Sequence, residues 1–358
     1  MALEADAYNK LLSSLSGTEK EELRGLYEKK KEIQRGIIRK AIEDDRYHLQ
    51  IVNFCINPFY QRSFLHSRTG YMFTRVEPFY NLGLKDFDAA IYNPDNKILI
   101  LVECKSSSYD PANEIDDILE TIKVSESNHA LLEKVIGARI TDKEYALCSS
   151  SSIIHKFKPA VLHKNANICL WSADLFENTL FLEKLAEDTT LEIKSGRLHK
   201  DAYLRQLLLN GVKCSTGSVP TITFLPSSHP YWKLVEVHSL LSFYMEKEGT
   251  EKFRVSDIQK ILEKEPALIN LTSNEIFGLA NQIVKLGLEI KIFVDETPTV
   301  TDALQKEFSS DVKRAYFRTT LQEIERRYIE FNASMKAEED AVNEFLKKRP
   351  TLEQYQKS

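Results

Sequence analysis

Acidic residues and a lysine at the ends of two neighbouring strand-like segments are the part of this sequence most able to do chemistry. Asp86 and Asp88 begin one segment, and Glu103 and Lys105 end the next. Because strand side chains alternate between faces, Glu103 and Lys105 project to the same side. The two aspartates share a face of their own strand for the same reason. The short turn Asn93–Asn96 joins the segments into a hairpin that brings an aspartate almost opposite Glu103.

Carboxylates in such a position repel each other unless a cation lies between them. Their hard oxygen atoms suit Mg²⁺, which keeps several waters and coordinates substrate phosphate. Such a metal would lower the pKa of a bound water and offset charge developing on a phosphoryl group. Lys105 could orient that water or stabilise an oxyanion. The simpler alternative is an ion pair between Glu103 and Lys105 at a strand end.

Which aspartate faces Glu103 depends on the turn. A tight turn centred on Pro94 and Asp95 would place Asp86 directly opposite Glu103. The apolar segment that follows Asp88 at once favours Asp88 instead.

The residues Asp88, Glu103, Cys104 and Lys105, set on strand, turn and strand, resemble the motif of the PD-(D/E)XK nuclease superfamily. The resemblance covers about residues 35–185 and includes the family's αβββαβ order; neither aspartate follows a proline. It implies that Asp88 and Glu103 hold Mg²⁺, for which Mn²⁺ substitutes. The Cys104 carbonyl would add a ligand, Asp86 remains a possible one, and Lys105 would assist the attacking water.

Weaker candidates lie around this motif. Ser106 directly follows Lys105 and could bond a phosphate oxygen. Glu43 or Glu77 could supply a further acid, although a solvated position is favoured for both.

The surrounding segments predict an α/β domain with a mixed central sheet, which the resemblance makes restriction-endonuclease-like. Helix is expected over the first 50 residues, over Ala112–Ile136 and from about Ala173 to Leu185. Strands are expected at the five segments that alternate or are wholly apolar: Tyr71–Glu77, Asp86–Tyr92, Lys97–Lys105, Glu144–Ser149 and Asn167–Trp171. This catalytic domain would span residues 1–210, followed by a linker over 211–229.

Residues 230–358 predict a mainly α domain of winged helix-turn-helix type. Helices are expected over Tyr231–Glu248 and Val255–Glu265, and Thr272 caps a third that ends at Gly287. A strand over Leu288–Val294 follows, and a helical pattern returns over 301–330.

The capped helix would be the recognition helix of this second domain. Its first turn carries Ser273 and Asn274, short polar residues suited to a major groove. Arg254 and Lys285 could meet phosphates. The alternative is that this domain serves protein contact or dimer packing.

The composition narrows the class of protein. The chain has 358 residues and a net charge of −5, so the overall charge does not indicate a nucleic-acid partner. Five cysteines are scattered singly, as in reduced cytosolic proteins. No apolar run approaches the ~20 residues of a membrane span, and no secretory signal is expected.

Taken with the resemblance to PD-(D/E)XK nucleases, these features predict a cytoplasmic, Mg²⁺-dependent endonuclease that cuts double-stranded DNA, most simply a type II restriction enzyme. A homodimer is expected because two strands of a near-symmetric target are cut, and no nucleotide cofactor or membrane is implied. One alternative is a repair or Holliday-junction nuclease of the same fold. The other is a DNA-binding regulator without catalysis.

Overall fold

The computed structural model describes residues 7–80, 82–173, 189–214, 222–268, 271–297, 305–311 and 317–349. The chain forms two compact units, which are considered separately. Unit 1 comprises residues 1–43, 229–262 and 273–358, and unit 2 comprises 44–228 and 263–272.

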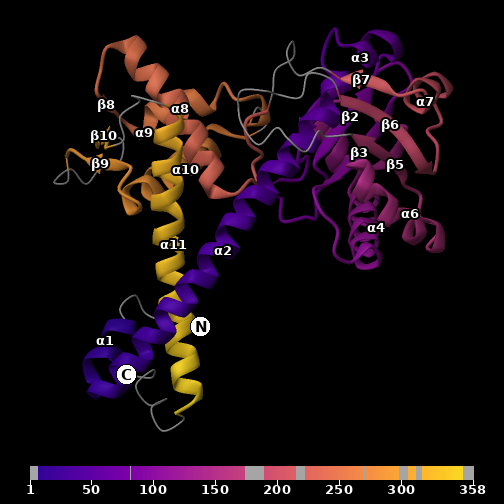
Figure 1. Cartoon of the computed structure of the whole chain (residues 1–358). Helices are drawn as coiled ribbons and strands as arrows, with labels where there is room; N and C mark the ends of the chain where they lie inside the picture. The colour runs from indigo at the N-terminus through magenta and orange to yellow at the C-terminus, as the bar shows by residue number, and fades with distance from the viewer. Residues whose placement is uncertain are drawn as a thin grey trace. The chain divides into compact units, whose positions relative to one another are not determined.

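Unit 2 is built on a seven-stranded mixed sheet whose strands follow chain order (Figure 1). The central pairs β3–β4 and β4–β5 are parallel, and the outer pairs are antiparallel. The mixed α/β class predicted from the sequence is therefore confirmed. The strands are β1 (Met72–Val76), β2 (Ala89–Asn93), β3 (Ile98–Lys105), β4 (Asp142–Ser149), β5 (Cys169–Ala173), β6 (Thr189–Gly196) and β7 (Val212–Cys214).

Helices cover both faces of this sheet. Alternate residues of β3 enter different cores: Leu99 and Leu101 pack under α4, α5 and α6, whereas Ile100 and Val102 pack under the end of α2 with η1, α3 and α7. A strand buried on both faces must be central, as its apolar sequence predicts. The helices are α2 (Gly17–Ile56), η1 (Asn57–Phe59), α3 (Phe64–Thr69), α4 (Pro111–Ser127), α5 (His129–Ile136), α6 (Ser151–His163) and α7 (Ala202–Leu209), with η2 (Pro266–Leu268) completing the unit.

Several details of unit 2 differ from the sequence-based expectation. The helix expected over Ala112–Ile136 is interrupted at Asn128, which caps both α4 and α5. The helix expected from Ala173 to Leu185 falls almost entirely outside the described residues.

The expected linker is also more structured than its composition indicates. Ile222 and Leu225 are buried in the core beneath α2, and β7 begins at Val212. Asn53 on α2 holds this segment by exchanging two hydrogen bonds of 2.9 Å with the backbone of Ile222. Residues 222–228 are therefore part of unit 2.

In unit 1 the N-terminal helices pack with the C-terminal helix, whereas the sequence assigned residues 1–50 to the first domain. Side chains of α1 (Ala7–Ser14), the start of α2 and α11 (Phe317–Lys347) share one core. Ion pairs flank it, including Lys30 with Glu344 at 2.7 Å and Arg35 with Glu330 at 2.6 Å. Among the described helices none has the length and apolar character to cross a membrane.

The rest of unit 1 alternates helices with short strands. A three-stranded antiparallel sheet has the order β8-β10-β9. The elements are α8 (Pro230–Glu248), β8 (Lys252–Phe253), α9 (Val255–Leu262), α10 (Ser273–Glu289), β9 (Phe293–Asp295) and β10 (Phe308–Ser310).

Three predictions about unit 1 are wrong. Helix α10 continues through Gly287 to Glu289, and Phe293 packs on this glycine: a Cβ atom there would lie 2.2 Å from the Phe293 ring. The expected strand over Leu288–Val294 is correspondingly reduced to β9. Phe308, expected in a helix, lies in β10, where it pairs with Phe253 and Asp295.

A buried lysine ties α4 to the sheet. The Lys143 side chain on β4 is 5% exposed, and its Nζ lies 2.8 Å from Glu126 Oε2. The Tyr145 hydroxyl also donates to Glu126. Burial acts to raise the pKa of Glu126, but these two partners outweigh it and lower that pKa.

We predict that Glu126→Gln lowers the free energy of unfolding by about 1 kcal/mol at neutral pH, because it removes the ion pair with Lys143. The loss is small because Glu126 is half exposed and solvent screens the pair. The pKa of Glu126 is lower in the folded state than in the unfolded chain, so its carboxylate stabilises the fold at pH values above the unfolded-state pKa. That stability is lost as the pH falls through the folded-state pKa. The difference between variant and wild type should therefore vanish in acid. Urea denaturation across pH measures it, with Lys123→Gln at an exposed position of the same helix as the control; a pH-independent difference contradicts the ion-pair explanation.

Candidate active site

The pairing of β2 with β3 decides which aspartate meets Glu103. Ala89 pairs with Val102 and Asn93 with Ile98, so the residue preceding Ala89 lies beside the residue following Val102. The residue before Ala89 is Asp88 and the residue after Val102 is Glu103. Asp88 Oδ2 accepts a hydrogen bond of 2.6 Å from the Cys104 N–H. Asp88 and Glu103 are thus neighbours at one end of the hairpin.

Asp86 is placed elsewhere. Its two carboxylate oxygens accept backbone N–H groups of Phe79, at 2.7 Å, and Phe87, at 2.8 Å. Burial raises the pKa of Asp86 to about 8 in spite of these bonds. Asp86 therefore fixes the loop before β2, and the structure does not bring its carboxylate to Glu103.

Glu103 and Lys105 share a face of β3, as their spacing predicts. Lys105 Nζ lies 2.6 Å from Glu103 Oε1, and the two side chains are 31% and 15% exposed. Burial and the charge of Asp88 raise the pKa of Glu103 to about 7. For Lys105, the attraction of Glu103 outweighs burial and raises the pKa. Cys104 stands between them with its side chain in the opposite core.

His48 on α2 completes this cluster, although no sequence pattern distinguishes it from the other seven of the eight histidines. Its Nε2 lies 3.1 Å from Asp88 Oδ1, although the approach is not aligned for a hydrogen bond. Burial acts to lower the pKa of His48, but the charge of Asp88 overcomes this and raises it to about 9. Burial likewise acts to raise the pKa of Asp88, and His48 reverses this and lowers it.

Glu77 is buried and contacts the backbone of Asp88, so the expectation of a solvated side chain was wrong. It adopts a φ of 40°, which is strained for a residue other than glycine, and its N–H donates to the Asp88 carbonyl at 3.2 Å. Its carboxylate accepts from both the hydroxyl and the N–H of Ser227. Glu77 therefore links residues 222–228 to the backbone of Asp88. Glu43, the other acid considered, is exposed.

Asp88 and Glu103 have the donor chemistry that Mg²⁺ requires. Within the described ranges, no group of three or more His, Cys, Asp or Glu side chains could hold a metal ion by itself. Mg²⁺ is commonly bound through one or two carboxylates, with waters and substrate phosphate completing its shell. Two adjacent, partly accessible carboxylates fit that mode. Burial and then the charge of Asp88 raise the pKa of Glu103, and a cation would offset the second of these.

A second Glu-x-Lys pair on the same sheet shows which feature is particular to the pair of Glu103 and Lys105. Glu192 and Lys194 on β6 also form an ion pair, with exposures of 26% and 31%. Glu192, however, pairs in register with Ser172 rather than with an acid. The feature that sets Glu103 and Lys105 apart is therefore the neighbouring Asp88.

The remaining candidates are dispersed. Ser106 directly follows β3 and is partly exposed beside Lys105. In unit 1, Arg254 pairs with Glu307 at 2.9 Å, and the Ser273 hydroxyl accepts from Gln259. The other two are exposed on α10: Asn274 in the first turn, and Lys285 about 18 Å along the axis from Ser273.

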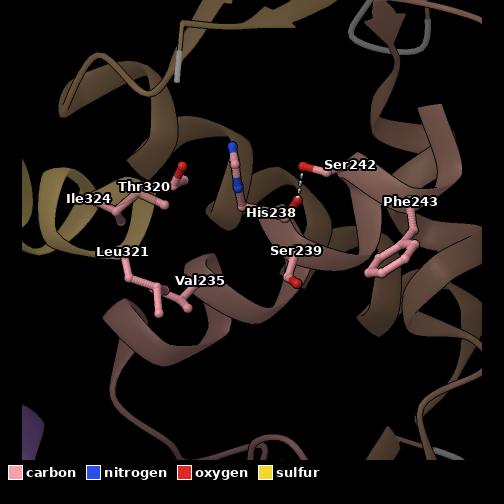
Figure 2. A pocket seen from close by; sticks show the side chains of 8 residues that line it. All are labelled: Val235, His238, Ser239, Ser242, Phe243, Thr320, Leu321 and Ile324. Carbon is pink, nitrogen blue, oxygen red and sulfur yellow. Dashed lines mark hydrogen bonds between the residues drawn. The ribbon is translucent and has the colours of Figure 1, made fainter. Parts of the chain in front are cut away.

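A separate pocket in unit 1 has a different character. It has a volume of about 410 Å³ and lies between α8 and α11 (Figure 2). None of its lining residues is an acid or a strong base, and His238 is turned to the Ser310 hydroxyl at 3.0 Å. The lining therefore offers no carboxylate oxygen to a Mg²⁺ ion. The lining residues are Val235, His238, Ser239, Ser242, Phe243, Thr320, Leu321 and Ile324.

Comparison with known proteins adds no functional evidence to this geometry. No protein-family model, curated protein or solved structure matches the chain. Any functional assignment accordingly depends on the cluster around Asp88 and Glu103.

We predict that Asp88→Asn lowers the pKa of Glu103 from about 7 toward its ordinary value, because the variant removes the adjacent negative charge. Asp86→Asn should change it less, since Asp86 faces the Phe79 and Phe87 backbone. Carbon-13 NMR of the Glu103 carboxyl across pH measures this pKa. An unchanged titration in Asp88→Asn would mean that the two carboxylates are not neighbours.

Proposed function

We propose that this chain is a Mg²⁺-dependent endonuclease that hydrolyses phosphodiester bonds in double-stranded DNA, with Mn²⁺ able to replace Mg²⁺. The observation that carries the proposal is the placement of Asp88 beside Glu103, with Lys105 Nζ 2.6 Å from Glu103. Two carboxylates and an amine at one strand end match the needs of metal-assisted phosphoryl chemistry.

Each residue has a distinct role in this proposal. Asp88 and Glu103 would hold the metal, which when bound supplies Lewis acidity and an activated water. Lys105, which stays cationic beside Glu103, would orient the attacking water or stabilise charge developing on phosphate. Its 31% exposure leaves the amine accessible to a substrate. Ser106, directly after β3, would bond a phosphate oxygen.

The order of elements in unit 2 supports this assignment. A helix, three antiparallel strands, a helical crossover and a further parallel strand precede α6, as in the αβββαβ order of PD-(D/E)XK nucleases. A restriction-type enzyme is the simplest member of that class, and cutting two strands of a near-symmetric site favours a homodimer.

Unit 1 would supply DNA recognition. Its order α8-β8-α9-α10-β9-β10, with β10 central, is consistent with a winged helix-turn-helix whose α10 enters the major groove. Exposed Asn274 at the start of α10 could read adenine, and Lys285 could contact phosphate.

The central test is cleavage of unmethylated plasmid DNA by the full chain with Mg²⁺, with Mn²⁺ and with EDTA. We expect metal-dependent cutting that Glu103→Gln and Lys105→Ala each reduce by about 10²–10⁴-fold, the range typical of lost acid–base or electrostatic groups. DNA affinity, measured in Ca²⁺, should remain close to that of wild type.

The matched controls are Glu192→Gln and Lys194→Ala, which remove the same motif from β6. They should cut like wild type. Equal loss in both pairs of variants would show that sheet stability, not chemistry, was affected. Binding of DNA without any metal-dependent cutting would favour a non-catalytic regulator, and selective cutting of branched DNA would favour a junction nuclease.

A separate prediction concerns unit 1. In the Glu103→Gln background, Lys285→Ala should weaken binding to all duplexes and reduce the slope of log affinity against log salt by about 1. Asn274→Ala should instead reduce discrimination between sites. Fluorescence anisotropy at several salt concentrations measures both, with exposed Lys336→Ala on α11 as control. If unit 1 serves dimer packing instead, both α10 variants will bind DNA as the control does.

A further inference from the structure

His48 reaches the site because of its place on α2. Ile51, Val52 and Cys55 lie three, four and seven residues further on, and all are fully buried in the core above the sheet. Residues at these spacings share a helix face, so His48 also points toward the sheet. The side chain is 24% exposed and therefore stands at the edge of that core.

This part of α2 is firmly anchored. Asn53 exchanges two hydrogen bonds with the Ile222 backbone, and Phe54 and Ile56 are buried. A histidine on such a segment keeps its distance from the β2–β3 hairpin. Its position is thus set by packing that is independent of the charged cluster.

His48 contacts the Asp88 carboxylate oxygen that does not accept the hydrogen bond from β3. Cys104 N–H holds Asp88 Oδ2 at 2.6 Å, and His48 Nε2 stands 3.1 Å from Oδ1. Nε2 is shielded from solvent and has no aligned hydrogen bond among the described residues, and the Asp88 carboxylate is the acid with which it forms an ion pair. The carboxylate is held from two sides, by a strand and by a helix.

We propose that His48 is a positioning residue that orients the Asp88 carboxylate for metal binding. The inference rests on the proposed function, because it assigns Asp88 to the metal. Carboxylate ligands are themselves held by outer partners, and loss of such a partner typically costs 10–100-fold in metal affinity. Asp88 retains further lone pairs for a cation while the Cys104 N–H hydrogen bond and the His48 contact hold the carboxylate from two sides.

The test is Mn²⁺ binding by isothermal titration calorimetry to the full chain without DNA. His48→Ala should bind Mn²⁺ about 10–100-fold more weakly than wild type, whereas His48→Gln, which retains a donor, should recover most of the affinity. In cleavage assays His48→Ala should need correspondingly more Mg²⁺ for half-maximal rate and approach the wild-type rate at saturation. A loss of packing alone would not be rescued by glutamine or by added metal.

The matched control is His129→Ala, which removes another histidine near a carboxylate: His129 Nε2 lies 3.5 Å from Glu133 on α5. It should bind Mn²⁺ like wild type. Wild-type affinity in His48→Ala, or equal losses in the Ala and Gln variants, would overturn the positioning role. Nitrogen-14 coupling to bound Mn²⁺ that disappears in His48→Ala would make His48 a direct ligand and would also overturn it.

The two proposals fail in different ways. If wild type binds Mn²⁺ and Glu103→Gln does not, but His48→Ala is unaffected, only the inference about His48 is overturned. If wild type and Glu103→Gln both show no Mn²⁺ binding, the proposed metal-dependent function is overturned, and the role of His48 with it.

Discussion

The register between β2 and β3 is the constraint on which the candidate site depends. Ala89 opposite Val102 forces Asp88 beside Glu103 and sends the two side chains to the same face. A shift of one residue would move either acid to the other face of the sheet, where Val102 and Cys104 are buried. The apolar residues of both strands resist such a shift, because each face has its own core.

The acidic pair is tolerated because cations surround it. Two carboxylates at a partly buried strand end repel each other and lose hydration. Lys105 lies against Glu103, and His48 lies against Asp88 from another element. The two acids respond differently: His48 lowers the pKa of Asp88, whereas burial and Asp88 raise that of Glu103 to about 7. The two carboxylates that the proposed metal site would use therefore lie in unlike environments.

The segment over 222–228 shows how a polar chain segment becomes part of a core. Ile222 and Leu225 bury their side chains under α2, and Asn53 and Glu77 satisfy the backbone N–H groups of Ile222 and Ser227. Buried polar backbone must find such partners. Since Glu77 also donates its N–H to the Asp88 carbonyl, this segment is connected to the site by hydrogen bonds rather than by mere proximity.

The sequence by itself determined much of the local structure. Alternation along β3 placed Glu103 and Lys105 on one face, and an apolar run without solvent-facing positions marked β3 as central. The sequence could not decide whether Asp86 or Asp88 lies opposite Glu103, because that depends on the geometry of the turn. The observed pairing of Asn93 with Ile98, with Lys97 at a φ of 57°, selects Asp88.

Only the tertiary structure decided which distant residues belong to the site and to each unit. His48 is forty residues before Asp88 and Glu77 appeared to be a solvated strand end. Gly287 has the residue type that often ends a helix, but here it lies within α10 and Phe293 packs on it. In each case the deciding interaction joins residues that are not neighbours in a repeating local pattern. Periodicity and turn chemistry describe one segment at a time, whereas burial and charge pairing depend on which segments meet.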